Sequence, residues 1–185
     1  MSKLRLATVW LGGCSGCHMA LLDLDEWLID LADQIDLVFS PFADIKEFPE
    51  DVDVTLVEGA IANEEHLEII RKVRERSRIL IAFGACAVVG NITALRNPLG
   101  SAKPVLERSY IETADINPQV PCAPGIVPPL IDKVLAVHEV VPVDINIPGC
   151  PPAPKRIRIV LESLLNEQKI TQKLTKNPQP ELAKR

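Results

Sequence analysis

The sequence lacks any hydrophobic run long enough to cross a membrane, and its first residues do not have the pattern of an export signal. Lys3 and Arg5 fall inside an alternating apolar segment, whereas a signal peptide has a charged head, an apolar stretch and a cleavage site. Basic residues do not outnumber acidic ones, and the net charge of -5 would repel a phosphate backbone. These absences predict a cytoplasmic protein with no membrane span and no nucleic-acid partner.

Internal repeats and low-complexity tracts are also absent. A chain of 185 residues suits one domain, because single domains commonly run to about 100 to 200 residues. We predict a single domain over residues 1–170 and a loosely ordered tail over 171–185. The proline-rich stretch 97–129 has weak periodicity, so we predict an irregular insertion there.

Short apolar runs alternate with amphipathic segments along most of the chain. The runs predict strands at residues 4–11, 35–39, 52–57, 78–83 and 143–147. Apolar residues at helical spacing predict helices at 19–32, 64–76 and 128–138, and a last one from about 157. This alternation is typical of an α/β fold in which helices flank an open parallel sheet.

Four of the five cysteines follow the ends of predicted strands. Cys14 and Cys17 come after the first strand, Cys86 after the fourth and Cys150 after the fifth. Loops that leave the carboxyl ends of parallel strands share one edge of the sheet, so we expect these thiols to converge there. Four thiolates suit either an iron-sulfur cluster or zinc, because both favour soft sulfur ligands.

The spacing of the cysteines favours the cluster. Small structural zinc sites commonly use two close pairs, whereas this chain offers one C-x-x-C pair and two single cysteines. Small neighbours leave room for an inorganic core and free backbone N–H groups to bond its sulfides. A zinc-stabilised or thiol-redox module that binds a partner remains the alternative. Cys122 lies in Pro-Cys-Ala-Pro, which matches none of the other contexts, and we predict that it is not a ligand.

Two further polar residues are expected at the same edge. Glu58 ends the third strand, where it is a candidate for a proton relay or an interface contact, or alternatively for a solvated acid or a helix cap. His18 is a candidate for bonding a cluster sulfur, although a lone histidine is more often a packed or capping group. FMN is disfavoured, because Cys14 and Cys17 occupy the loop that would bind its phosphate.

Four short sequence motifs follow one another along the chain. They are Cys14-Ser15-Gly16-Cys17-His18, Val57-Glu58-Gly59-Ala60-Ile61, Gly84-Ala85-Cys86-Ala87 and Gly149-Cys150-Pro151-Pro152-Ala153-Pro154. This set resembles the small subunit of nickel-iron hydrogenases over about residues 4 to 165. The resemblance implies a flavodoxin-like domain with one proximal 4Fe-4S cluster held by Cys14, Cys17, Cys86 and Cys150. It also implies a nickel-iron large subunit as partner, so this chain would be a non-catalytic subunit without a substrate site.

Many members of that family carry a twin-arginine signal and a cysteine-rich C-terminal region for two more clusters, and neither is found here. The sequence is therefore similar to the soluble, bidirectional, NAD-linked type, in which a diaphorase with flavin and further clusters takes the electrons. The related quinone-linked subunit of respiratory complex I is the alternative. It has two adjacent cysteines at the first position, whereas Ser15 and Gly16 separate them here. The final acceptor, whether NAD, NADP or ferredoxin, stays open.

Overall fold

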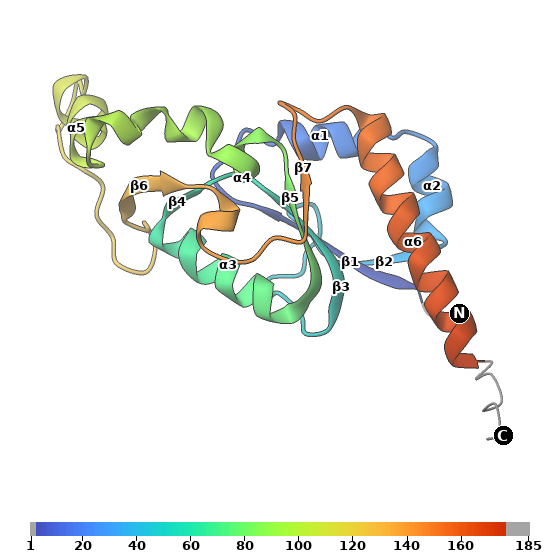
Figure 1. The fold of residues 1–185 in the computed structure, drawn as a ribbon. Helices are drawn as coiled ribbons and strands as arrows, with labels where there is room; N and C mark the ends of the chain where they lie inside the picture. The colour runs from blue at the N-terminus through green and yellow to red at the C-terminus, as the bar shows by residue number, and fades with distance from the viewer. Residues whose placement is uncertain (1–2, 177–185) are drawn as a thin grey trace, which may run out of the picture.

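A sheet of five parallel strands forms the centre of the computed structural model, which describes residues 3–176 (Figure 1). Its strands are β1 (Leu4–Trp10), β2 (Ile35–Phe39), β3 (Val52–Glu58), β5 (Ser77–Phe83) and β7 (Ile145–Ile147). They lie in the order β2-β1-β3-β5-β7, and every pairing is parallel. Counted along the chain this is the flavodoxin-like order 2-1-3-4-5. The predicted α/β class is confirmed.

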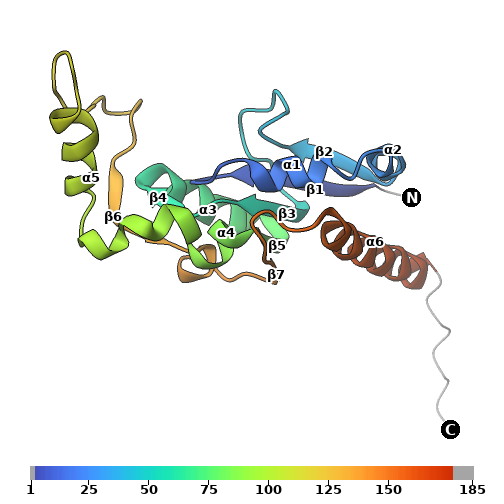
Figure 2. The ribbon, with the colours of Figure 1, turned by 90° about the horizontal axis from the view of Figure 1, so that it is seen from above.

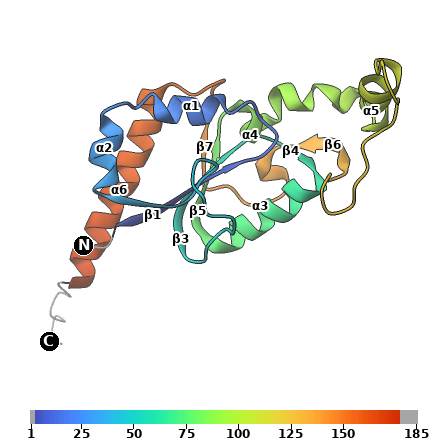
Figure 3. The same ribbon diagram turned by 180° about the vertical axis from the view of Figure 1, so that it is seen from behind.

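Helices cover both faces of the sheet (Figures 1 and 3). On one face lie α1 (Gly16–Leu22), α2 (Trp27–Ala32) and α6 (Pro154–Lys176), and on the other lie α3 (Glu64–Arg76) and α4 (Ala85–Val89). Side chains of a strand alternate between the faces. Leu6 therefore packs in the core cluster that holds Ile157 of α6, whereas Val9 packs in the cluster that holds Ile70 of α3.

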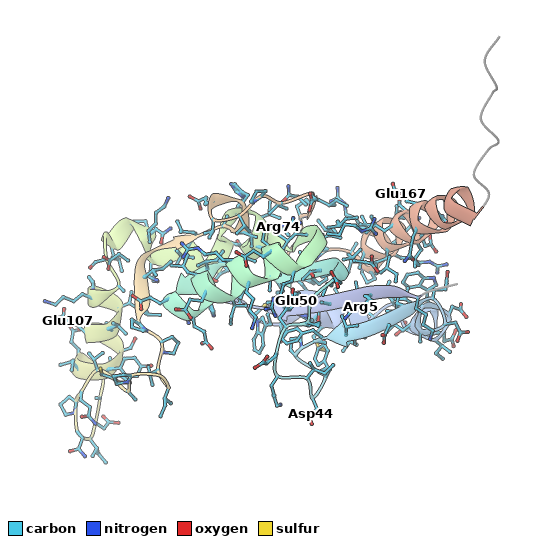
Figure 4. The ribbon with its side chains drawn as sticks, turned by 90° about the horizontal axis from the view of Figure 1, so that it is seen from below. Arg5, Asp44, Glu50, Arg74, Glu107 and Glu167 are labelled. Carbon is cyan, nitrogen blue, oxygen red and sulfur yellow. The ribbon has the colours of Figure 1, made fainter. Side chains whose placement is uncertain are left out.

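A smaller two-stranded sheet adjoins this layer and leads to a projecting arm. Here β4 (Ile61–Asn63) pairs antiparallel with β6 (Leu130–Leu135). The other short elements are the 3₁₀ helices η1 (Asn91–Leu99) and η3 (Val137–Glu139), helix α5 (Lys103–Glu107) and the π-helical turn η2 (Arg108–Glu112). Figure 2 shows α5 at the end of the molecule away from α6. Figure 4 accordingly shows Glu107 and Glu167 at opposite ends.

Two of the predicted helices are wrong. Residues 130–135 form β6 instead of part of a helix at 128–138, because a short apolar run does not distinguish the two states and pairing with β4 decides. The helix predicted over 19–32 is divided into α1 and α2. Asp25, between them, has a φ of 50°, a left-handed conformation that a continuous right-handed helix does not accommodate.

The insertion and the tail also differ from expectation. Residues 97–129 are irregular only from 113 onward, because η1, α5 and η2 occupy most of the earlier part. Helix α6 extends to Lys176, into the predicted tail of 171–185, and residues 177–185 lie outside the described part. The single-domain boundaries stay a prediction. Within residues 3–176, no helix is both long and apolar enough to cross a membrane.

Candidate metal centre

The carboxyl ends of the sheet strands bring four loops together. Leu11 N donates to Glu58 O (2.8 Å), which joins the loops after β1 and β3. Gly84 N donates to Ile147 O (2.8 Å) and Ala85 N donates to Gly149 O (2.7 Å), which join the segments after β5 and β7. In Figures 1 and 3 the starts of α1 and α4 and the segment after β7 all lie at this edge. The expected convergence of the loops is therefore present.

Cys17 is the most buried of the four thiols at this edge of the sheet. It lies in the first turn of α1 and is buried. Burial raises the pKa of its thiol to about 12, and the negative charges of Glu58, Cys86, Cys14 and Cys150 contribute to that rise. The other three predicted ligands thus lie close enough to act electrostatically on Cys17. A metal bound at this edge would act in the opposite direction on the pKa, because a coordinating thiol is deprotonated.

The remaining three thiols lie nearer to solvent. Cys14 and Cys150 are exposed and Cys86 is partly exposed. Cys86 and Cys150 are linked by one side chain, because Asn91 Nδ2 lies 3.8 Å from Cys86 Sγ and 3.5 Å from Cys150 Sγ. The site therefore has a buried floor at Cys17 and an open side at Cys14 and Cys150.

Gly84 shows how closely the sulfur-bearing loops approach each other. Its φ of 88° is in the region that favours glycine, and a Cβ added there would lie 2.1 Å from Cys17 Sγ. The donor set is four thiols at one edge with small residues between them, which fits the soft ligands of an iron-sulfur cluster. Among residues 3–176, no group of three or more His, Cys, Asp or Glu side chains is arranged to hold a single metal ion.

Glu58 and His18 form a buried pair beneath these loops. Glu58 Oε2 accepts from His18 N (2.9 Å) and lies 2.5 Å from His18 Nδ1, while Glu58 Oε1 accepts from Cys17 N (3.3 Å). Burial would raise the pKa of Glu58, but the hydrogen bonds from His18 and Cys17 and the attraction of the imidazole leave it below its usual value. Glu58 therefore caps the first turn of α1, rather than the helix that follows it in sequence.

The His18 imidazole is held inside the protein. Its ring meets Phe42 and Phe83 edge-on, with centroids 5.5 and 6.2 Å away. Within the described residues, Nε2 is buried without a hydrogen-bond partner, and no hydrogen bond links His18 to a cysteine sulfur. The side chain therefore serves the Glu58 contact, and its predicted bond to a cluster sulfur stays a prediction.

Cys122 and Asn91 occupy very different places relative to the four thiols. Cys122 is exposed and lines a surface pocket with Glu64 and Glu68 at the start of α3, and it is not among the thiols that act on Cys17.

Asn91 contacts two of the four thiols, Cys86 and Cys150, although the sequence analysis did not predict this contact. The signal that could have found it is a Gly-Asn pair that ends five residues beyond Cys86, where asparagine readily takes a left-handed turn.

A doubly wound α/β domain with four cysteines at the carboxyl edge defines the class of this protein. The chain belongs to the family described as NADH ubiquinone oxidoreductase, 20 Kd subunit, whose model matches residues 14–164. That description does not distinguish respiratory members from hydrogenase members, whereas the names of individual relatives do.

Curated relatives and one solved structure are hydrogenase proteins. The chain is 44% identical to an F420-non-reducing hydrogenase subunit of Methanococcus voltae, over 83% of this chain and 53% of that protein. It is 41% identical to NAD-reducing hydrogenase HoxS subunit delta of Cupriavidus necator, over 89% of this chain and 79% of that protein. A crystal structure of NAD+-reducing [NiFe]-hydrogenase in the H2-reduced state has a chain with a TM-score of 0.85 and 38% identity, over 90% of this chain and 93% of that one.

These matches confirm the resemblance to hydrogenase subunits that the motifs predicted. The chain spans about half the length of several curated relatives, including the proteins of Methanococcus voltae (53%) and Methanocaldococcus jannaschii (56%). It spans most of the Cupriavidus necator subunit.

Proposed function

We propose that this chain is the electron-transfer small subunit of a cytoplasmic, NAD(P)-linked, bidirectional nickel-iron hydrogenase. It would hold one 4Fe-4S cluster through Cys14, Cys17, Cys86 and Cys150. The observation that carries the proposal is that the loops bearing these thiols meet at the carboxyl edge of one parallel sheet. There Asn91 Nδ2 lies within 3.8 Å of both Cys86 Sγ and Cys150 Sγ, and Gly84 lies against Cys17 Sγ. When bound, the cluster would supply one-electron redox chemistry.

The chain's own residues supply position and insulation. Glu58 holds the first turn of α1 through the N–H groups of Cys17 and His18, so contacts within the chain itself position the C-x-x-C segment. Phe83 and the apolar side chains of α1 and α6 pack with Cys17 in one buried core cluster. This layer would keep water and oxidants away from the inner side of the cluster.

The open side of the site favours a partner subunit. Cys14 and Cys150 are exposed, as are Trp10, Met19 and Val89 near the same edge. A cluster ligated there would remain solvent-facing on one side until another surface covered it, and exposed apolar side chains favour such docking. We assign that role to a nickel-iron large subunit, with diaphorase subunits carrying flavin and further clusters as later acceptors.

Metal analysis of the full chain tests the proposal. The chain is produced and purified without oxygen, and its iron, sulfide and zinc are measured beside the EPR spectrum of the reduced protein. About four iron and four sulfide per chain with a 4Fe-4S signal are expected. Stoichiometric zinc without visible absorption would favour the partner-binding zinc or thiol module instead.

Co-purification tests the partner assignment. The tagged chain is recovered anaerobically from its native cells, and the bound proteins are identified and assayed for nickel. A nickel-containing subunit with hydrogen-dependent reduction of a pyridine nucleotide is expected. Recovery with quinone-linked respiratory subunits and no nickel would instead support the complex I-like alternative.

A further inference from the structure

The side-chain amide of Asn91 contacts two of the four thiols. Its Nδ2 lies 3.5 Å from Cys150 Sγ and 3.8 Å from Cys86 Sγ, within the longer reach of hydrogen bonds to sulfur. Those two cysteines are 64 positions apart in the sequence and leave different strands, β5 and β7. Asn91 itself belongs to none of the four motifs.

The backbone fixes this side chain in place. Asn91 follows Gly90 at the end of α4 and begins η1, with a φ of 42° that asparagine and glycine tolerate better than other residues. Two later residues of η1 anchor the helix. Thr93 Oγ1 donates to Gly12 O (2.9 Å), and the Arg96 guanidinium donates to the carbonyl oxygens of Ala62 and Ile131. The amide is therefore presented to the sulfurs by a tethered segment.

The chemistry of the partners fixes which end of the amide faces them. A metal-bound thiolate only accepts hydrogen bonds, so the NH2 end of Asn91 is complementary to Cys86 and Cys150, whereas its Oδ1 would oppose them. Hydrogen bonds to the sulfurs of an iron-sulfur cluster are among the factors that set its reduction potential. They stabilise most strongly the reduced state, because that state carries one more negative charge.

We propose that Asn91 sets the reduction potential of the cluster, raising it by donating hydrogen bonds to the Cys86 and Cys150 thiolates. The inference rests on the proposed 4Fe-4S site and deepens it, since it names a residue beyond the ligands. Asn91 does not bind iron and is not needed for the cluster to assemble. Its role is to bias the site toward accepting an electron.

Two substitutions remove the donor with the backbone preserved. Asn91→Gly deletes the amide and suits the positive φ, and Asn91→Asp keeps the shape but replaces the NH2 with a negatively charged oxygen. Asn117→Gly is the matched control, because Asn117 has a similar φ of 49° but is exposed in the insertion. Each full chain is purified anaerobically, its iron and sulfide are measured, and its midpoint potential is determined by EPR-monitored titration.

The order of the midpoint potentials of wild type and the three variants tests the proposed role of Asn91. We expect wild type and Asn117→Gly to agree, Asn91→Gly to titrate at a more negative potential, and Asn91→Asp at one more negative still, all with equal iron. An unchanged or raised potential in an iron-replete Asn91 variant would overturn the inference. Loss of iron from Asn91→Gly would also overturn it, because Asn91 would then act in assembly. A wild-type chain without a 4Fe-4S signal would instead remove the proposed function itself, which the iron and sulfide values reveal separately.

Discussion

Glu58 and His18, 40 positions apart, are joined twice, because one carboxylate oxygen faces both the backbone N–H and the imidazole of His18. The other oxygen accepts from Cys17 N. The end of β3 and the start of α1 are thereby joined beneath the thiols. A single buried acid thus sets the position of the C-x-x-C segment relative to the sheet.

Glu58→Gln should destabilise the fold. The amide can still accept through its oxygen, but its NH2 group would face a donor, and an unsatisfied buried group costs about 1 to 3 kcal/mol. We expect a loss of about 2 kcal/mol in the free energy of unfolding, measured by urea denaturation. Glu26→Gln, at an exposed position, serves as the control and should be near neutral. Equal stabilities for the two variants would contradict the role given to Glu58.

Gly84→Ala should disturb the metal site through Cys17. The new Cβ would lie 2.1 Å from Cys17 Sγ, so the thiol or the loop must move. Gly125 is the matched control, because it has a φ of 78° and nothing within 4 Å of an added Cβ, so that Gly125→Ala carries the backbone strain alone. We expect iron content after anaerobic purification to fall sharply in Gly84→Ala and to stay at the wild-type value in Gly125→Ala. Full iron retention in Gly84→Ala would argue against a close Cys17 contact.

Asp144 should make stability depend on pH. Burial would raise its pKa, but hydrogen bonds from Leu80 N (2.7 Å) and Arg74 and the attraction of the guanidinium hold the pKa below its usual range. Figure 4 shows Arg74 on α3. A carboxylate with a lowered pKa in the folded state stabilises the fold above its unfolded pKa of about 3.9 and loses that contribution as the pH falls through the folded value.

We therefore expect Asp144→Asn to be less stable than wild type at pH 7, by about 1 kcal/mol once solvent screening of this half-exposed pair is allowed for. The difference should narrow as the pH falls below about 4, where the wild-type carboxylate takes up its proton. Urea denaturation at several pH values measures it, with the exposed Asp23→Asn as control. A difference that stays constant down to low pH would show that the charge of Asp144 contributes nothing.

The strands of the main sheet could be predicted from sequence because they are short, apolar and separated by clear breaks. The edge that carries Cys14, Cys17, Cys86 and Cys150 could be predicted for the same reason, since parallel strands bring their carboxyl ends together. Strands β4 and β6 could not be predicted in this way. Each is short, and what makes them strands is a pairing between Ile61 and Leu135, far apart in the chain.

The polar contacts of the site were harder to predict from the sequence than the strands were. Glu58 was placed at the correct edge, but its partner His18 is distant in sequence and lies on a different element, so periodicity gives no sign of the bond. The position of Asn91 depends on how α4 ends and η1 begins, which a weakly patterned segment does not reveal. Long-range side-chain contacts need the assembled fold.

Iron content in two cysteine variants tests the central claim most directly. Cys150→Ser removes a proposed ligand at the carboxyl edge, whereas Cys122→Ser removes an exposed thiol beside the start of α3. After anaerobic purification, Cys150→Ser should lose or alter the 4Fe-4S signal, and Cys122→Ser should match wild type in iron, sulfide and EPR spectrum. A cluster that survives unchanged in Cys150→Ser but disappears in Cys122→Ser would contradict the proposed ligand set.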